Sequence, residues 1–321
     1  MPTRVLALDI GGTKLTVGVV ADSGDVLAER VARTNPAYSP NDILDRLFAM
    51  SEEALLETGL SQHDLSGIGV SFGGPVDFPG GRTVTCHHLP GWENFPLRDV
   101  VAERTGLPAI VDNDANAAAL GEVRFGAARG CQHVLYLTVS TGVGGGLVLD
   151  GRVHRGANSM AGEIGHTLVV PEGPMCTCGR RGCLEAVASG PAIARAAREA
   201  MAAGETSTLA DVPEEGLTAR QVAGAAPRDA LAARVLGEAG RAMGVVIAAA
   251  VNLVNPEMVV IGGGVSQAGE ALFAPLRESV NQHAVPESAQ SLRIVPGALG
   301  QRGGLLGAAA LALSEPRLTF R

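Results

Sequence analysis

The chain has 321 residues, of which 46% are hydrophobic and 18% charged, and its formal net charge is −8. This length suits two domains better than one, and the acidic balance argues against nucleic acid as the main partner, because phosphate contacts need a basic surface. Apolar runs are short and broken by glycine or charge, and the first residues do not resemble a signal peptide. We therefore expect no membrane segment and a reduced, cytoplasmic compartment.

The first part of the chain predicts a β-meander followed by alternating helices and strands. Strands are expected at residues 4–9, 15–20, 26–33, 68–72 and 109–111. Helices are expected at residues 41–58, 97–105 and 115–125. Asn41 is the predicted N-cap of the first helix, since a short polar side chain there can accept a backbone N–H.

The pattern then restarts, which indicates a weak internal duplication. A strand at 134–139 leads into a glycine turn at 140–146 and a return strand at 147–150. Further strands are expected at 258–261 and 292–295, further helices at 191–201, 229–254 and 303–313, and a helical insertion at 203–228. We expect a small domain over 1–115, completed by the C-terminal helix 301–321, and a large domain over 116–300, with a central cleft between them.

A histidine and three cysteines stand close together in the second half of the chain. His166 precedes a polar, glycine-rich loop that carries Cys176, Cys178 and Cys183. Three thiolates and one imidazole complete a tetrahedral zinc shell with no position for water, as in structural zinc sites. The alternative is a set of buried thiols, but the loop is polar and a disulfide cannot pair three cysteines. We predict that zinc holds two segments in register, so that the flanking Glu163 and Glu185 face a polar ligand.

Three glycine turns follow apolar strands. The residues predicted to bind a phosphate-bearing cofactor and its metal ion there are Asp9, Gly11, Gly12, Thr13, Lys14, Thr141, Gly142, Gly262 and Gly263. Backbone N–H groups in such turns can form an anion nest, and a carboxylate beside it can hold Mg²⁺ through water. One such turn alone can simply close a hairpin. Three turns in two α/β halves indicate a nucleotide polyphosphate, although none has Walker spacing and the first leads to a strand rather than to a dinucleotide-binding helix.

Asn113 and Asp114 lie where a predicted strand meets an Ala-rich helix. Asp114 can be a helix cap, or it can be the carboxylate that accepts a hydroxyl proton during phosphoryl transfer. Amide, carboxylate and imidazole groups also suit the dense hydroxyl pattern of a polyol. The predicted polyol ligands are Asn113, Glu163, His166 and Glu185.

Taken together, the motifs resemble those of the ROK family of sugar kinases and repressors. They are LALDIGGTK (6–14), VSFGGPVD (70–77), VDNDANAAALGE (111–122), TGVGGG (141–146), AGEIGH (161–166), CTCGRRGCLE (176–185) and VVIGGGVS (259–266). The resemblance implies an actin-like ATPase (ribonuclease H-like) α/β fold, ATP with Mg²⁺, and phosphorylation of a hexose at its 6-hydroxyl. It also implies that Asp114 is the catalytic base, that His166 serves both zinc and sugar, and that the protein is a homodimer or homotetramer.

The family leaves two questions of function open. Its repressors carry a DNA-binding domain ahead of the kinase-like body, whereas here few residues precede the first strand and Asp114 is present, so we expect a kinase. Glucose is the expected substrate. N-acetylmannosamine or N-acetylglucosamine is the main alternative, and mannose or fructose is a further one. The space around the sugar 2-position, near residues 156–160, is expected to decide among them.

Overall fold

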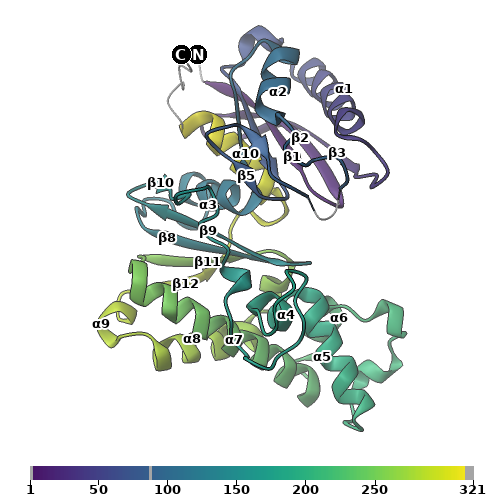
Figure 1. The fold of residues 1–321 in the computed structure, drawn as a ribbon, viewed down its shortest axis with the longest axis vertical. Coiled ribbons are helices and arrows are strands. Elements are labelled where there is room, and N and C mark those ends of the chain that lie inside the picture. Colours follow the sequence, from purple (N-terminus) through teal and green to yellow (C-terminus); the bar gives the residue numbers. More distant parts are fainter. Residues whose placement is uncertain (1–2, 87–88, 315–321) are drawn as a thin grey trace. The chain divides into compact units, whose positions relative to one another are not determined.

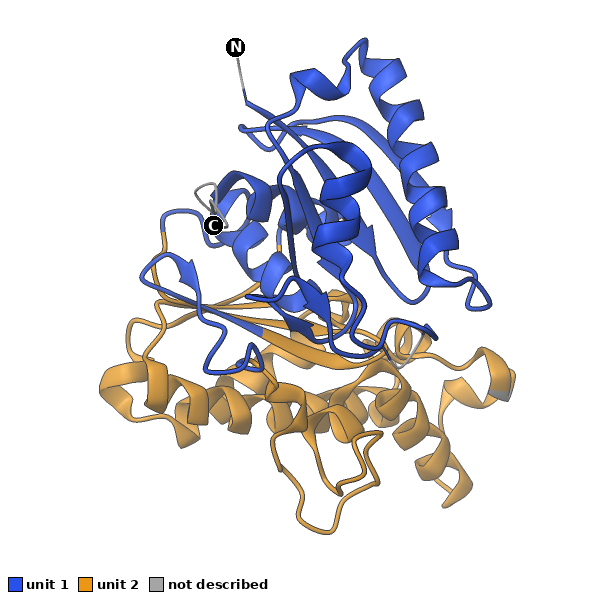
Figure 2. Ribbon diagram, turned by 45° about the horizontal axis from the view of Figure 1, so that its top comes forward, with its two compact units in different colours: residues 1–130, 146–161, 298–321 blue, residues 131–145, 162–297 orange. Residues whose placement is uncertain are grey.

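A computed structural model of the chain describes residues 3–86 and 89–314 (Figure 1). The chain forms two compact units, one of residues 1–130, 146–161 and 298–321, the other of residues 131–145 and 162–297 (Figure 2). Residues 116–130 and 146–161, which we expected in the large domain, thus group with the N-terminal part. Residues 315–321 of the predicted C-terminal helix lie outside the described part of the chain.

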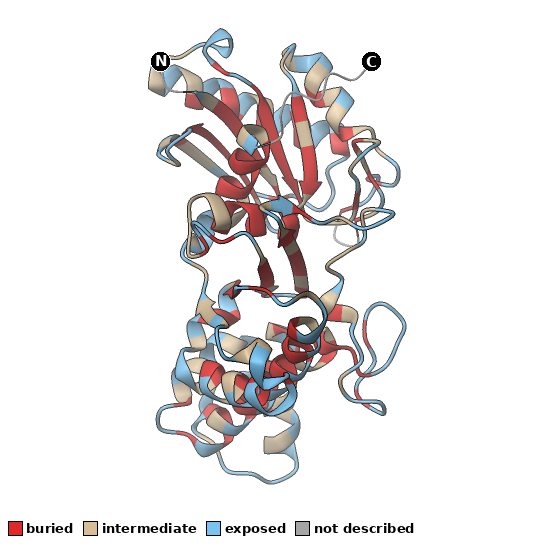
Figure 3. Ribbon diagram, turned by 90° about the vertical axis from the view of Figure 1, so that its left-hand side faces the viewer, coloured by how far each residue is buried: buried red, intermediate tan, exposed pale blue. Residues whose placement is uncertain are grey.

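The first unit is built on a five-stranded sheet in the order β3-β2-β1-β4-β7. Its strands are β1 (Arg4–Ile10), β2 (Lys14–Ala21), β3 (Val26–Arg33), β4 (Ile68–Phe72) and β7 (Ala109–Asn113). The first three are antiparallel neighbours, and β4 and β7 continue parallel to β1. Residues of this sheet are mostly buried (Figure 3). Alternate residues of β1 belong to different apolar clusters, as the side-chain alternation of a strand requires.

Helices cover both faces of this sheet. They are α1 (Pro40–Thr58), α2 (Leu97–Thr105), α3 (Asp114–Arg124) and α10 (Gly303–Ser314), and two short strands, β5 (Val76–Asp77) and β6 (Arg82–Thr83), form a separate pair. Leu6 and Leu8 belong to the apolar core under α1, whereas Val5 and Ala7 pack on α10. The closing helix therefore packs on the first unit, as predicted.

The second sheet repeats the same topology, β10-β9-β8-β11-β12, which confirms the predicted duplication. Its strands are β8 (Val134–Val139), β9 (Val143–Leu149), β10 (Arg152–Val153), β11 (Met258–Gly262) and β12 (Arg293–Pro296). Its helices are α4 (Leu184–Ala188), α5 (Gly190–Ala202), α6 (Ala219–Ala225), α7 (Ala230–Val254), α8 (Glu270–His283) and α9 (Pro286–Ala289). The boundary between the units runs within β9.

Helix α7 is the one helix among the described residues that is long and apolar enough to cross a membrane by length and composition. In this structure 67% of its apolar window is buried inside the protein, against α4, α5, α6 and α8. Such burial is typical of the core helix of a globular unit.

Two local predictions were wrong, and one helix was not predicted. The first helix is capped by Ser39 and not by Asn41, because Ser39 and Asp42 form a reciprocal capping box. Helix α8 was not predicted, since Pro275 interrupts its pattern. The return strand starts at Val143 rather than at residue 147, so most of the glycines that we assigned to a turn lie in β9.

Candidate active site and metal centre

In the first unit, three parallel strands end at the same edge of the sheet. Asp9 of β1 is in register with Ser71 of β4, and Ser71 with Asp112 of β7. The Ser71 hydroxyl donates to Asp9 Oδ1 over 2.9 Å. A Cβ on Gly304 would lie 2.4 Å from that carboxylate, so Asp9 lies directly against the start of α10, where backbone N–H groups attract negative charge. Burial raises the pKa of Asp9, an effect opposed by Ser71 and the Lys14 charge.

The predicted phosphate turn joins β1 to β2 beside this carboxylate. The N–H of Gly11 donates to the carbonyl of Lys14 over 3.0 Å, with Gly12 and Thr13 between them. Lys14 Nζ donates to the carbonyl of Gln301 over 3.1 Å, immediately before α10. The turn, its lysine and Asp9 are therefore held together within the first unit.

Asp114 is the first residue of α3, directly after β7. The cap of this helix is its neighbour Asn113, whose Oδ1 accepts the N–H groups of Ala115 at 2.9 Å and Asn116 at 3.4 Å. Asn113 Nδ2 donates to the carbonyl of Gly74 over 3.1 Å, which leaves its second N–H. Asp114 Oδ1 also accepts from Ala115, at 2.8 Å. The capping function that competed with catalysis is thus carried mainly by Asn113.

Protein surrounds most of the Asp114 carboxyl, although the residue keeps a solvent-accessible edge. Burial raises its pKa to about 6, and the negative charge of Asp9 adds to the rise, against hydrogen bonds from Ala115 and Asn113 that lower it. A carboxylate with a near-neutral pKa is matched to general-base catalysis near neutral pH.

Sequence reasoning missed a buried ion pair beside this residue. Arg155 Nε donates to Asp112 Oδ2 over 2.8 Å, and the Asp112 side chain is only 2% exposed. Asp112 Oδ1 accepts the N–H of Asn113 at 2.8 Å, and the Arg155 guanidinium stacks 3.4 Å from the centre of the Phe78 ring. Arg155 is 43 residues from its partner, so no local spacing pointed to it. The pair ties the segment after β10 to the strand end that carries Asp114.

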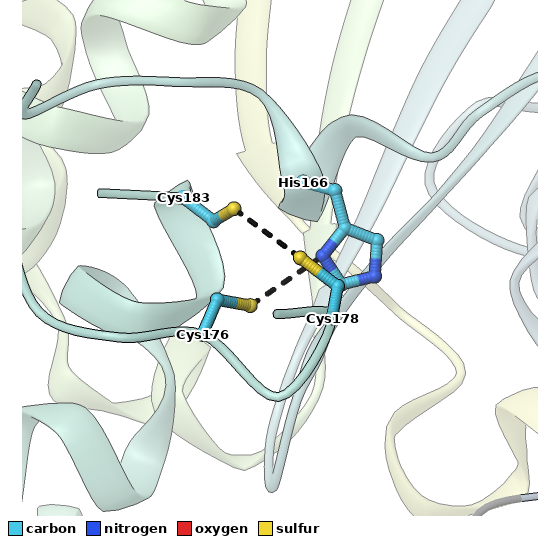
Figure 4. A group of neighbouring side chains, drawn as sticks. All are labelled: His166, Cys176, Cys178 and Cys183. Carbon is cyan, nitrogen blue, oxygen red and sulfur yellow. Dashed lines mark hydrogen bonds between the residues drawn. The ribbon is translucent and has the colours of Figure 1, made fainter. Parts of the chain in front are cut away.

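In the second unit the four predicted metal ligands come together (Figure 4). One ligand atom from each of His166, Cys176, Cys178 and Cys183 lies within 4.8 Å of all the others. Cys178 Sγ is 3.6 Å from Cys183 Sγ, and Cys176 Sγ is 3.6 Å from His166 Nδ1. Ligands about 2.1–2.3 Å from a tetrahedral zinc are separated by about 3.5–3.8 Å. The donor set and its spacing therefore fit this ion.

Acidic side chains surround the metal cluster. His166 Nδ1 faces the sulfurs, while Nε2 lies 3.8 Å from Glu163 Oε2, the kind of carboxylate contact that orients a ligating imidazole. Burial raises the pKa of Cys176, and that of Cys183 to about 12, so a bound cation would have to displace protons from these thiols.

Glu185 lies between the cysteines and the second glycine turn. Its Oε1 accepts the Thr177 hydroxyl at 3.0 Å, and its Oε2 accepts the N–H of Val143 at 3.0 Å. A Cβ on Gly142 would lie 2.6 Å from Oε2, so the turn Thr141–Val143 packs directly on this carboxylate.

The third glycine turn belongs to the same edge of the second sheet. Gly262 ends β11 and is in register with Thr138 of β8. The backbone of Gly263 passes close to Val139, the last residue of β8. The predicted site residues therefore form two groups, one in each unit: Asp9 to Lys14 with Asn113 and Asp114, and Thr141 and Gly142 with Glu163, His166, Glu185, Gly262 and Gly263.

The sequence profile of the ROK family matches residues 5–315, and the chain belongs to this family. It is 37% identical to a glucokinase of Thermotoga maritima over 96% of both chains, and 36% identical to an N-acetylmannosamine kinase of Citrobacter koseri over 97% of this chain and 99% of that one. It is also 31% identical to a xylose repressor of Caldicellulosiruptor bescii, over 97% of this chain and 78% of the repressor.

Solved structures agree on the fold. A glucokinase of Streptomyces griseus in complex with glucose and AMPPNP aligns with a TM-score of 0.83 at 34% identity, covering 97% of this chain and 100% of that one. A ROK family transcriptional regulator aligns with a TM-score of 0.87 at 31% identity, covering 98% of this chain and 78% of that one. The fold is the actin-like ATPase fold of ROK proteins, as predicted. Because kinases and regulators share it, function has to be argued from the site.

Proposed function

We propose that the chain is an ATP-dependent hexose kinase that transfers the γ-phosphate of ATP to the 6-hydroxyl of glucose. The observation that carries this proposal is the Asp114 carboxyl, largely enclosed at the β7–α3 junction with its pKa raised to about 6. Near full-length similarity to glucokinases supports the choice of glucose.

In this mechanism Asp114 accepts the proton of the sugar 6-hydroxyl as that oxygen attacks the γ-phosphorus and the bond to the β-phosphate oxygen of ADP breaks. Phosphoryl transfer needs little further covalent chemistry, so the remaining groups act by positioning and by charge. The glycine turns after β1, β8 and β11 hold the phosphates through backbone N–H groups. Mg²⁺ belongs beside Asp9, where it would offset phosphate charge when bound.

We assign sugar recognition to Asn113 and to three further side chains, those of Glu163, His166 and Glu185. Asn113 retains one amide N–H after its bond to Gly74, and Glu163 and Glu185 offer carboxylate oxygens. His166 can present Nε2 to a hydroxyl while Nδ1 serves the metal cluster. These are the groups expected to sense the stereochemistry of the hexose.

We assign structural zinc to His166, Cys176, Cys178 and Cys183, because the four ligands leave no open position. Thiolate ligands suit a reducing, cytoplasmic compartment. A homodimer or homotetramer is proposed on the family resemblance, and the apolar residues that α7 exposes, Val245 and Leu253, are candidates for the contact. Light scattering that gave the mass of a single chain at micromolar concentration would contradict this assembly.

N-acetylmannosamine kinase is the second candidate, because one such enzyme is 36% identical over 97% of this chain. A repressor is a third, but the raised pKa of Asp114 provides a base that ligand sensing alone does not need.

A coupled assay of ADP release, with ATP and a panel of sugars, separates these functions. The panel contains glucose, mannose, fructose, N-acetylglucosamine and N-acetylmannosamine, and glucose should give the highest kcat/KM. An N-acetylhexosamine above glucose would replace the proposed substrate. Sugar binding without turnover would favour the repressor class. Asp114→Asn protein, prepared in parallel, is the control for kinase activity that comes from a contaminant.

A further inference from the structure

The two carboxylate oxygens of Glu185 contact different parts of the second unit. Oε1 accepts the hydroxyl of Thr177 at 3.0 Å, and Cys176 Sγ lies 3.7 Å from the same oxygen. Oε2 accepts the N–H of Val143 at 3.0 Å. One half-buried side chain therefore joins the cysteine loop to the first residue of β9.

Both contacts constrain what they touch. Thr177 stands between two metal ligands, Cys176 and Cys178, so a metal ion that holds the ligands also holds Thr177. On the other side, a Cβ on Gly142 would lie 2.6 Å from Oε2, which shows how tightly the turn after β8 packs on the carboxylate. A displaced carboxylate would leave the Val143 N–H without its acceptor, and the turn would keep the bonds from Ser140 N–H to Gly142 and from Gly190 N–H to Ser140.

Backbone hydrogen bonds close the cysteine loop, among them Cys176 N–H to the carbonyl of Arg180 over 2.7 Å and Gly182 N–H to the carbonyl of Pro174 over 2.9 Å, but few of its residues are buried. Between residues 171 and 182 only Gly173, Cys176 and Gly182 are buried. The local apolar cluster consists of Cys176, Cys183 and Ala186 alone. A metal ion would add a link between the cysteine side chains of this loop and His166, and it would therefore restrict the position of Thr177 further.

We propose that Glu185 is a positioning residue through which occupation of the cysteine–histidine site sets the conformation of the Ser140–Val143 turn, and thereby its affinity for nucleotide phosphate. The second half of this statement rests on the proposed kinase function, and the first half does not. Coupling between two sites of this kind is typically worth about 5–150-fold in affinity. By reciprocity, bound nucleotide should raise the affinity for the metal by the same factor.

Thr177→Val is the variant that isolates this contact. It removes the hydroxyl that Glu185 accepts, keeps the side-chain shape, and changes none of the residues assigned to metal, sugar or phosphate. Thr206→Val, at an exposed threonine elsewhere in the second unit, is the matched control. Metal content is measured first, and both variants should hold about one zinc per chain.

Amide hydrogen exchange then measures the protection of the turn directly, and the measurement needs neither enzyme activity nor nucleotide. Chelation of the wild type should raise exchange at the Val143 amide, and metal-loaded Thr177→Val should show the same direction of change, with Thr206→Val like the wild type. Unchanged exchange at Val143 in metal-loaded Thr177→Val would overturn the proposal. The comparison of metal-loaded Thr177→Val with the wild type tests the proposal even if the chelated wild type unfolds.

Calorimetric titration with AMPPNP tests the consequence for nucleotide. Thr177→Val should bind the analogue about 5-fold or more weakly than the wild type, with Thr206→Val unchanged. Equal affinities, together with wild-type exchange at Val143, refute the coupling. If the metal-loaded wild type does not bind AMPPNP at all, the kinase function fails instead, and the exchange result still decides whether Glu185 couples the two sites.

Discussion

In the first unit, Asp9, Asp112 and Asp114 stand at the ends of parallel strands, above a core of buried aliphatic side chains. In the second unit, His166 and the three cysteines stand in loops whose local apolar cluster has only three members. The two groups thus obtain their geometry from different sources. Sheet register and a packed core position the carboxylates, whereas the histidine and thiols stand in loops held mainly by backbone hydrogen bonds, where a bound ion would add a link between the side chains.

This difference predicts opposite responses to perturbation. Removing the ion should disturb the second group and leave the strand ends of the first intact. Breaking a buried charge pair should do the reverse. Buried carboxylates are costly to the fold but can be reactive, because desolvation shifts their pKa toward neutrality.

The largest effect is expected from Cys178→Ser. The variant should lose its zinc, and the free energy of unfolding should fall by several kcal/mol, because metal-binding energy is folding energy in such loops. Metal analysis by mass spectrometry and denaturant unfolding measure the two quantities. Cys86→Ser, at a buried thiol of the first unit, is the control and should keep its metal. A folded, active Cys178→Ser protein would show that the second group needs no ion.

Arg155→Met should disturb the first group alone. It leaves the Asp112 carboxylate buried without its partner, which typically costs about 3–5 kcal/mol. Adding Asp112→Asn should restore part of the loss, because no buried charge is then unpaired. Zinc content should stay at the wild-type value. If Arg155→Met is as stable as the wild type, the ion pair does not hold the end of β7 in place.

The pH dependence of kcat/KM should carry the signature of Asp114. Burial raises its pKa to about 6, so the carboxyl is ionised and able to accept a proton above that pH. As pH falls below about 6 the protonated fraction grows, and kcat/KM should decrease about tenfold per pH unit. Metal content has to be measured at each pH, since thiolate ligands also take up protons in acid. A flat profile down to pH 5 would argue against a base with this pKa.

A smaller effect is expected at Asp229, the N-cap of α7. Its carboxylate accepts the N–H groups of Ala232 and Thr208 and the hydroxyl of Ser207, and these bonds hold its pKa well below the usual range. Asp229→Ala should cost about 1–2 kcal/mol at pH 7, with little change in turnover. Because the lowered pKa stabilises the fold only while the unfolded carboxyl is ionised, the difference from wild type should shrink below pH about 4. A constant difference from pH 7 to pH 3 would contradict this origin.

Much of the fold could be predicted because apolar runs bounded by glycine or polar residues mark buried strands. The strands at 68–72 and 134–139 have the predicted bounds. Helix α8 could not be predicted from periodicity, because Pro275 interrupts it and only packing on α7 makes it favourable. The glycines of β9 read as a turn, although tertiary contacts make them a strand.

The same limit applies to the site. Ligands that share a short loop, such as Cys176 and Cys178, are recognisable by spacing. Arg155 and Asp112 are not, because only tertiary packing brings residues 43 apart into contact. Glu185 was predicted as a sugar ligand from its motif. Its bond to Val143 depends on how α4 lies against β9, which no local pattern encodes.

The most direct test of the central claim is to measure kcat and stability on one Asp114→Asn preparation at pH 8. Asn113 caps α3, and a neutral amide removes a buried charge whose raised pKa opposes folding by up to about 3 kcal/mol at that pH. We therefore predict that the variant is at least as stable as the wild type, holds zinc and binds ATP, and that its kcat is lowered about 10²–10⁴-fold. Near-wild-type turnover in a folded Asp114→Asn protein would contradict this prediction and leave Asp114 without a catalytic role.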